Sequence, residues 1–108
     1  MKLDINELAS KSRLQDCNET LKVLSHNKIV FFSWGPQAFK NFSNRVLRFK
    51  VNGHNHKGHV YVAVNGSDLY DVYLTTTRGN IVKEIRDIYF DELQDRVDDA
   101  VERIDSYV

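Results

Sequence analysis

Three stretches in the middle of the chain alternate apolar and polar residues, which is the pattern of β-strands that bury one face. They are Arg45–Val51, His59–Val64 and Leu69–Thr75. Asn65-Gly66-Ser67 separates the second from the third and predicts a hairpin turn, because Asn-Gly readily adopts positive φ angles. A weaker pattern over Ile81–Ile88 predicts one more strand. The short connections between these strands indicate an antiparallel meander.

Apolar residues at helical spacing mark both ends of the chain. An amphipathic helix is predicted over about residues 11–25 from the spacing of Leu14, Cys17, Leu21 and Leu24, and an extension back through Ile5 and Leu8 is the alternative start. Because Cys17 belongs to this apolar stripe, it is expected to be a small core residue. A second helix is predicted to begin near Asp91, which can cap it. Its apolar stripe consists of Leu93, Val97, Ala100, Val101 and Ile104.

An aromatic-rich segment lies between the first helix and the alternating strands. Ile29–Phe32 is a short run of β-branched and aromatic residues, which predicts a buried strand that ends at Trp34-Gly35-Pro36. The following Gln37–Asn44 is expected to be a loop or a short helical turn. The rings of this segment are expected to plug one end of the core. An exposed Trp34 would instead be an anchor for a partner.

These elements predict one α+β domain over residues 1–108, because a second domain would have too few residues for its own core. The expected architecture is a two-layer sandwich with an N-terminal helix, an antiparallel meander of four to five strands and a C-terminal helix. Both helices are expected to cover one face of the sheet. The other face is expected to show Arg48, Lys50, Tyr61 and Tyr73 to solvent or to a partner.

The formal net charge of zero conceals a separation of charge along the chain. The 39 residues from Lys28 to Gly66 contain six basic residues and no Asp or Glu. Residues 67–108 contain five basic and eleven acidic residues, a net charge of −6. This distribution indicates an oriented binding surface, or two halves whose charges neutralise each other in the fold.

Two surfaces are candidate binding sites. The basic and aromatic sheet face has cations for phosphates and rings that can stack on bases, which would suit nucleic acid. The C-terminal helix carries an acidic strip that would suit a protein partner, or the basic sheet of a second copy in a dimer. The simpler interpretation of both is a solvated face. The strip consists of Asp95, Asp98, Asp99 and Glu102.

Few residues suggest catalysis or metal binding. The loop sequence HNHKGH can gather His54, His56 and His59 around one metal ion, but it holds no Cys or carboxylate to complete the site. Incidental loop histidines are the simpler interpretation. The sequence contains no serine-hydrolase elbow, phosphate-binding loop or zinc-protease motif. We therefore expect a non-enzymatic protein with no metal and no cofactor.

The setting of the protein is inferred from two features of the sequence. No apolar run approaches the length of a membrane span, so no membrane partner is expected. Cys17 is the only cysteine, which excludes an intrachain disulfide and suits a reducing compartment. Both features favour a cytoplasmic protein.

Three short blocks, in this order, resemble a group of small uncharacterised proteins of phages, prophages and other mobile elements. The blocks are Phe32–Phe39 (FSWGPQAF), Asp68–Tyr73 (DLYDVY) and Ile88–Leu93 (IYFDEL). The chain departs from the group at Trp34, Pro36 and Gln37, where Thr, Ala and Lys are more common. The resemblance implies an accessory protein of a mobile element that acts on a host or phage component, and it carries no catalytic residue.

Taken together, these observations predict a small protein that binds a macromolecule without catalysing a reaction. The leading hypothesis is a protein–protein interaction, and an inhibitor of a host system is a specific form that rests on the resemblance alone. The alternative is a nucleic-acid-binding accessory protein that uses the basic, aromatic sheet face.

Overall fold

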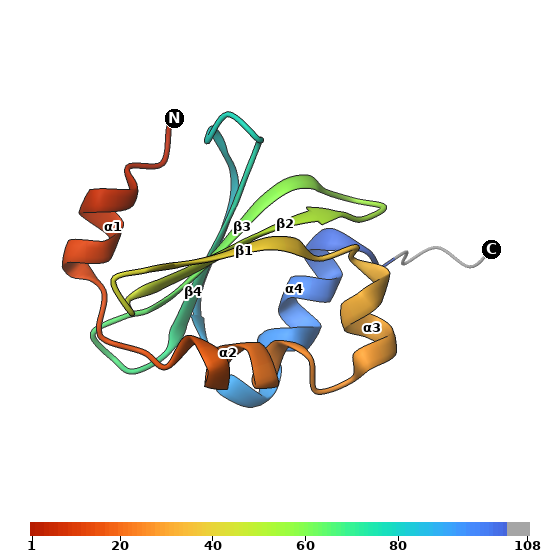
Figure 1. Ribbon diagram of the computed structural model, residues 1–108, viewed down its shortest axis with the longest axis horizontal. Coiled ribbons are helices and arrows are strands. Elements are labelled where there is room, and N and C mark those ends of the chain that lie inside the picture. The colour runs from red at the N-terminus through yellow and green to blue at the C-terminus, as the bar shows by residue number, and fades with distance from the viewer. Residues whose placement is uncertain (104–108) are drawn as a thin grey trace.

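A meander of five antiparallel strands forms the centre of the computed structural model, which describes residues 1–103 (Figure 1). In sheet order the strands are β1 Gln37–Phe42, β2 Val46–Asn52, β3 Lys57–Val64, β4 Tyr70–Thr75 and β5 Ile81–Ile88. The helices are α1 Ile5–Lys11, α2 Cys17–Leu24, α3 Lys28–Ser33 and α4 Leu93–Val101, with a 3-10 turn η1 at Phe90–Glu92. The predicted α+β class, with an antiparallel meander between terminal helices, is confirmed.

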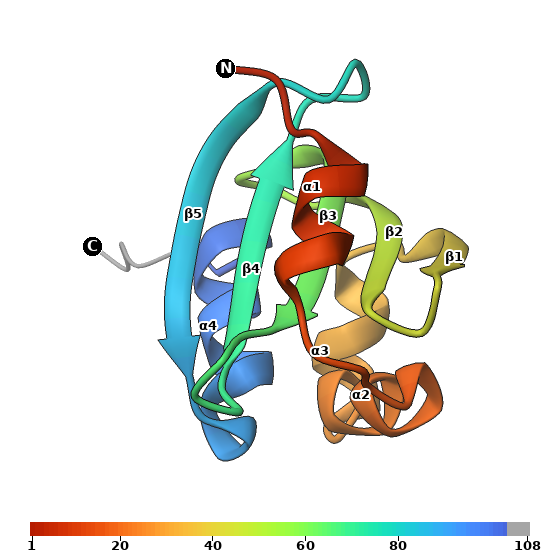
Figure 2. The ribbon, with the colours of Figure 1, turned by 90° about the vertical axis from the view of Figure 1, so that its left-hand side faces the viewer.

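The alternating stretches form β2, β3 and β4, as predicted. The strands pair in register, with Phe49 opposite Val60 and Val62 opposite Val72. Their inward side chains are almost fully buried beneath α2, α3 and α4 (Figure 2). Apolar and polar residues alternate strictly in these strands because each strand is paired on both sides and packs one face against the core.

Helix α1 covers part of the opposite face of the sheet, where no helix was expected (Figure 2). Its Leu8 is buried in a second, smaller apolar cluster. The buried sheet residues of this cluster are Val46, Tyr61, Ala63 and Tyr73. The sheet is therefore sandwiched between three helices on one side and one short helix on the other.

The helix predicted over residues 11–25 is confirmed only at α2, and the extension through Ile5 and Leu8 is a separate helix, α1, with its own cap. Asp4 accepts hydrogen bonds from the first turn of α1, and Asp16 does the same for α2. Between α1 and α2 the backbone forms hydrogen bonds with β3 and with the β1–β2 turn. Arg13 N–H donates to Val64 O at 2.8 Å, and Gln15 N–H donates to Asn44 O at 2.7 Å. These bonds replace helical ones, and Leu14 is exposed rather than part of an apolar stripe.

The buried strand predicted at Ile29–Phe32 is wrong, because this segment is helix α3. Asn27 caps it by accepting hydrogen bonds from Ile29 and Val30 N–H at 3.1 and 3.3 Å. A run this short is ambiguous between strand and helix, and the cap decides in favour of the helix. As a helix it buries only one side: Phe31 enters the core, whereas Ile29 and Phe32 face outward.

The loop predicted at Gln37–Asn44 is wrong as well, because Gln37–Phe42 is the edge strand β1. Ser43 and Asn44 have positive φ angles of 56° and 54° and turn the chain into β2. Ala38, at φ 56°, lies in a β-bulge that interrupts the register between Gln37 and Lys40. The strand is mostly exposed on both faces, so its sequence carries no clear alternation.

The C-terminal helix forms as predicted, with a different start. Asp91 lies within η1, and the first residue before α4 is Glu92, which makes no side-chain cap hydrogen bond. Leu93, Val97 and Val101 are fully buried against the sheet. Ile104, the last residue of the predicted apolar stripe, lies outside the described residues.

Candidate functional site

The acidic strip on α4 is partly neutralised by its own chain. Arg103 Nη1 lies 2.7 Å from Asp99 Oδ1, and its Nε lies 3.4 Å from Asp98 Oδ2. Its Nη2 lies 3.9 Å from Asp95 Oδ1. One cation thus faces three of the four carboxylates that sequence analysis assigned to a partner.

Two members of the strip also have structural roles. Asp98 Oδ1 accepts a hydrogen bond of 2.9 Å from the indole Nε1–H of Trp34, a ring that is fully buried. Glu102 Oε2 accepts a hydrogen bond of 2.6 Å from the backbone N–H of His54. A buried indole N–H without an acceptor is costly, so Asp98 stabilises the core rather than an interface. Trp34 is therefore not the exposed anchor considered above.

The exposed rings predicted on the basic sheet face are not exposed. Tyr61 and Tyr73 are only 7% and 4% exposed, because α1 lies over them. Burial is also the largest cause that raises the pKa of the Tyr73 hydroxyl. The two tyrosines therefore offer no stacking platform to nucleic acid while α1 is in place.

The cations of this face remain together on the part of the sheet that α1 leaves open. Lys40 on β1 pairs across the strands with Arg48 on β2, and Lys50 pairs with His59 on β3. We name these four residues the basic cluster. Burial, and then the charges of Arg48 and Lys50, lower the pKa of His59. No carboxylate within residues 1–103 forms a salt bridge with any of the four.

One aromatic ring supports the basic cluster. Lys40 Nζ and Arg48 Cζ lie 5.0 and 5.3 Å from the ring centroid of Phe42, within the range of cation–π contacts. Arg48 Nε is buried and has no hydrogen-bond partner among the described residues. The ring attracts both cations, but it supplies no negative charge to neutralise them.

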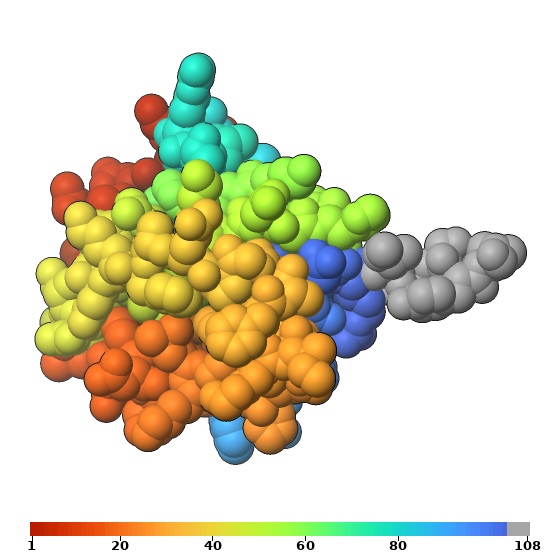
Figure 3. Space-filling model, turned by 45° about the vertical axis from the view of Figure 1, so that its right-hand side comes forward, coloured from red at the N-terminus to blue at the C-terminus, as the bar shows by residue number. Residues whose placement is uncertain are grey.

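Three exposed apolar side chains belong to α3 and β1, two elements that lie next to each other on one face of the molecule (Figure 3). Ile29, Phe32 and Phe39 are 85%, 66% and 44% exposed. Ile29 and Phe32 are three residues apart on a helix and hence share one side. Phe31 connects the two elements, with ring centroids 5.5 Å from Phe32 and 6.3 Å from Phe39. We name the three exposed residues, together with the outer edge of β1, the α3–β1 surface.

The two edges of the sheet differ. β1 ends the strand order, and no strand within residues 1–103 pairs with its outer side. β5 ends the other side, but the first residues of the chain pair at its start: Ile81 N–H donates to Met1 O and Leu3 N–H donates to Gly79 O, both at 2.8 Å. At its other end, Asp87 has a positive φ of 57° and interrupts the strand.

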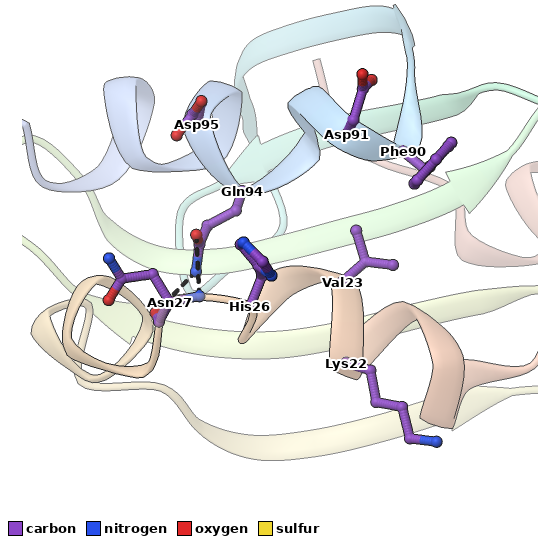
Figure 4. A pocket seen from close by; sticks show the side chains of 8 residues that line it. All are labelled: Lys22, Val23, His26, Asn27, Phe90, Asp91, Gln94 and Asp95. Atoms are coloured by element: carbon purple, nitrogen blue, oxygen red, sulfur yellow. Dashed lines mark hydrogen bonds between the residues drawn. The ribbon is translucent and has the colours of Figure 1, made fainter.

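A surface hollow of about 620 Å³ lies between the α2–α3 connection and the start of α4 (Figure 4). Gln94 closes one side: its Nε2–H donates to Leu24 O at 2.7 Å and to Asn27 O at 2.9 Å. At its rim, Lys22 points away from Asp91 and Asp95, which lie together on the opposite side of the hollow (Figure 4). Within residues 1–103, no salt bridge joins Lys22 or His26 to Asp91 or Asp95 across this hollow, so the hollow offers no coupled acid–base pair.

The histidines and the cysteine do not form a recognisable reactive centre. Within residues 1–103, no three or more His, Cys, Asp or Glu residues are placed to hold a metal ion. His56 is buried with Nε2 3.3 Å from His59 O, and His54 is exposed. Cys17 is buried in the core as predicted, and burial raises the pKa of its thiol, which opposes nucleophilic use.

The basic cluster was thus predicted in part from the sequence, and the α3–β1 surface was not. Arg48 and Lys50 lie where they were predicted, whereas Ile29 and Phe32 were assigned to a buried strand. The available signal was Asn27, a favoured N-cap residue directly before the apolar run. If Asn27 is taken as the N-cap, the apolar run Ile29–Phe32 is helical, and Ile29 and Phe32 lie on one side while Phe31 lies on another.

Comparison of the chain with protein-family models, with curated proteins and with solved structures found no significant match in any of the three. No helix within residues 1–103 is long and apolar enough to cross a membrane.

Proposed function

We propose that this chain is a non-enzymatic binding protein that docks a protein partner on the α3–β1 surface. The observation that carries the proposal is the exposure of Ile29, Phe32 and Phe39 beside a strand edge that no strand of residues 1–103 covers. Large apolar side chains that cluster at a surface are typical of protein–protein contacts, where aromatic anchors supply most of the binding energy. The proposal keeps the predicted class of function and moves its surface away from the acidic strip.

A protein suits this surface better than a nucleic acid does. Its exposed centre is apolar, and the stacking rings predicted for bases are buried beneath α1. The basic cluster still favours nucleic acid as a second candidate, because it is cationic and unpaired within residues 1–103. Anisotropy titration of labelled oligonucleotides at low and moderate salt tests that candidate. Steeply salt-dependent binding that Arg48→Glu abolishes would support it.

The resemblance to proteins of phages, prophages and other mobile elements supports an accessory role for this binding activity. In that role the partner is a component of the host or phage cytoplasm, and blocking a host system is one form of it. The lone, buried Cys17 is compatible with a reducing compartment.

Site-directed photo-crosslinking followed by reconstitution tests the proposal. A photo-reactive phenylalanine analogue is placed at position 32, and in a control at the exposed Val82 of β5. A protein cross-linked only from position 32 is purified, and its affinity is measured for the wild type, Phe32→Ser and Val82→Ser. We expect Phe32→Ser alone to weaken binding about tenfold or more. Equal affinities of the two variants, or no direct binding, would refute the docking surface.

A further inference from the structure

We infer that the partner adds a strand to the outer edge of β1, and that this strand alternates apolar and acidic side chains. The inference rests on the proposed function, because it specifies what the α3–β1 surface binds. It names a partner chemistry: an extended segment whose apolar residues meet α3 and whose carboxylates meet the basic cluster.

The outer edge of β1 is available for pairing with an added strand. β1 has a strand partner on one side only within residues 1–103, and five of its six residues are exposed. An edge strand presents backbone N–H and C=O groups that an extended peptide can pair with. The opposite edge is less suitable, because Met1 and Leu3 already bond to its start.

The two faces of β1 present different environments to an added strand. Phe39 faces α3, with its ring centroid 5.5 Å from that of Phe49 in the core. The next residue, Lys40, faces the other way and pairs with Arg48. Side chains of an added strand alternate between the same two faces. Every second residue of the partner would therefore contact Phe39 and Phe32, and the residues between would contact Lys40.

The positive charges of the basic cluster complement an acidic strand. Lys40, Arg48 and Lys50 form no salt bridge with a carboxylate in residues 1–103. The segment from Lys28 to Gly66 contains no acidic residue at all. An Asp or Glu on the added strand would supply the missing negative charge beside cations that are themselves close together.

A second copy of the chain fits this edge less well than an acidic partner. If two β1 strands paired, Lys40 and its basic cluster would face the same cations in the other copy. The Ala38 bulge and the edge lysine are also the kind of feature that discourages an edge from pairing with itself. Neither feature opposes a partner of opposite charge along the regularly paired part of the strand, Lys40–Phe42, which directly follows Phe39.

Display libraries of short peptides test the partner chemistry with the full chain as bait. One library alternates random apolar residues with Asp or Glu, a second alternates them with Lys or Arg, and a third contains the first composition in separate apolar and acidic blocks. We expect selection of binders from the first library alone. No enrichment over the block library would overturn the inference.

Selected peptides are then titrated against matched variants by fluorescence anisotropy. Lys40→Glu on one edge strand is compared with Lys83→Glu on the other, since both lysines are exposed. We expect Lys40→Glu to weaken binding about fivefold or more and Lys83→Glu to leave it unchanged. Equal effects of the two reversals would mean that the carboxylates are attracted by general charge and would contradict the assigned site.

Backbone pairing is tested with two N-methylated forms of one selected peptide. Each form is methylated at alternate residues, so that the two together cover both edges of the added strand. Because only one edge can face β1, one form should lose binding and the other should keep it. Binding of both forms, or loss of both, would exclude strand addition.

The outcomes separate this inference from the proposed function. If no peptide library is enriched but a purified partner still binds in a Phe32-dependent manner, strand addition is wrong and the docking surface stands. If the partner depends on neither Phe32 nor Lys40, both are wrong. Concentration-dependent dimers that Phe32→Ser disrupts would assign the surface to a second copy. Oligonucleotide binding that is lost in Lys40→Glu would assign the cations to nucleic acid. Either the dimer or the oligonucleotide result would overturn the inference that the partner is an acidic strand.

Discussion

The indole N–H of Trp34 donates to the carboxylate of Asp98 at 2.9 Å and thereby ties the end of α3 to the middle of α4. Trp34 is also stacked on Phe49, with ring centroids 6.4 Å apart and planes 12° from parallel. The bond fixes where α3 ends, immediately before β1 begins. The placement of Ile29 and Phe32 at the surface consequently depends on a buried carboxylate of the acidic strip.

Replacement of Asp98 by Ala should destabilise the fold more than replacement of Asp99. Asp98→Ala leaves the buried indole N–H without its acceptor, a loss of about 1–3 kcal/mol in the free energy of unfolding. Asp99→Ala removes a half-exposed ion pair with Arg103 and should cost less than about 1 kcal/mol. Urea unfolding followed by the fluorescence of the chain's single Trp measures both. Equal losses would show that the Trp34 bond contributes no more than a surface pair.

Gly53 is predicted to be intolerant of a side chain. A Cβ at this position would lie 2.4 Å from Val101 O, at the point where the β2–β3 loop meets the end of α4. Gly53→Ala should therefore cost about 1–3 kcal/mol through overpacking. The control is Gly66→Ala, where a Cβ would meet no atom within 4 Å. Thermal unfolding of both variants provides the comparison, and a stable Gly53→Ala would show that the α4 end moves freely.

Ala38→Gly should stabilise the protein. Ala38 has a φ of 56°, a left-handed conformation that is unfavourable for residues with a Cβ. Glycine relieves this cost and loses part of the gain through its more flexible unfolded state, which leaves a net gain of about 0.5–1 kcal/mol. The matched change Ala9→Gly, inside α1, should destabilise by about 1 kcal/mol. A loss of stability in Ala38→Gly would mean that the bulge is held by contacts of its methyl group.

The stability of the fold should decrease as the solution is acidified through the histidine range. Burial lowers the pKa of both His56 and His59 below the value of an unfolded chain. The unfolded state therefore binds more protons below about pH 6.5, and the free energy of unfolding falls as pH drops from there. Urea midpoints between about pH 7.5 and 5.5 should show this slope, and His56→Gln should reduce it. A urea midpoint that rises as the pH is lowered would contradict this prediction.

The elements that sequence analysis identified are those in which one face of a regular pattern is buried. β2, β3 and β4 lie inside the sheet, and the alternation follows the face that packs on the larger core, although α1 also buries Tyr61, Ala63 and Tyr73 on the other face. β1 has exposed residues on both faces and therefore no such pattern. Ile29–Phe32 is too short for its period to distinguish helix from strand, and a hydrogen-bonding cap decides it.

The candidate site was harder to predict because it depends on contacts between distant residues. Tyr61 and Tyr73 are buried only because the first helix ends early and folds over them. The acidic strip is partly neutralised by Arg103, which the i, i+4 spacing of Asp99 and Arg103 could have indicated. The bond from Trp34 to Asp98 joins distant residues and does not follow from spacing. Arg48 and Lys50 were placed correctly, since strand alternation alone determines their face.

The unequal edges of the sheet limit the stoichiometry of any complex built by strand pairing. Met1 and Leu3 bond at the start of β5, and the irregularity at Asp87 interrupts its end, whereas no strand of residues 1–103 pairs with the outer side of β1. A molecule with one free edge can accept one strand, but it offers no equivalent edge for the next molecule. Complexes should therefore terminate at one partner per chain, and filaments assembled edge to edge should not grow from the native state.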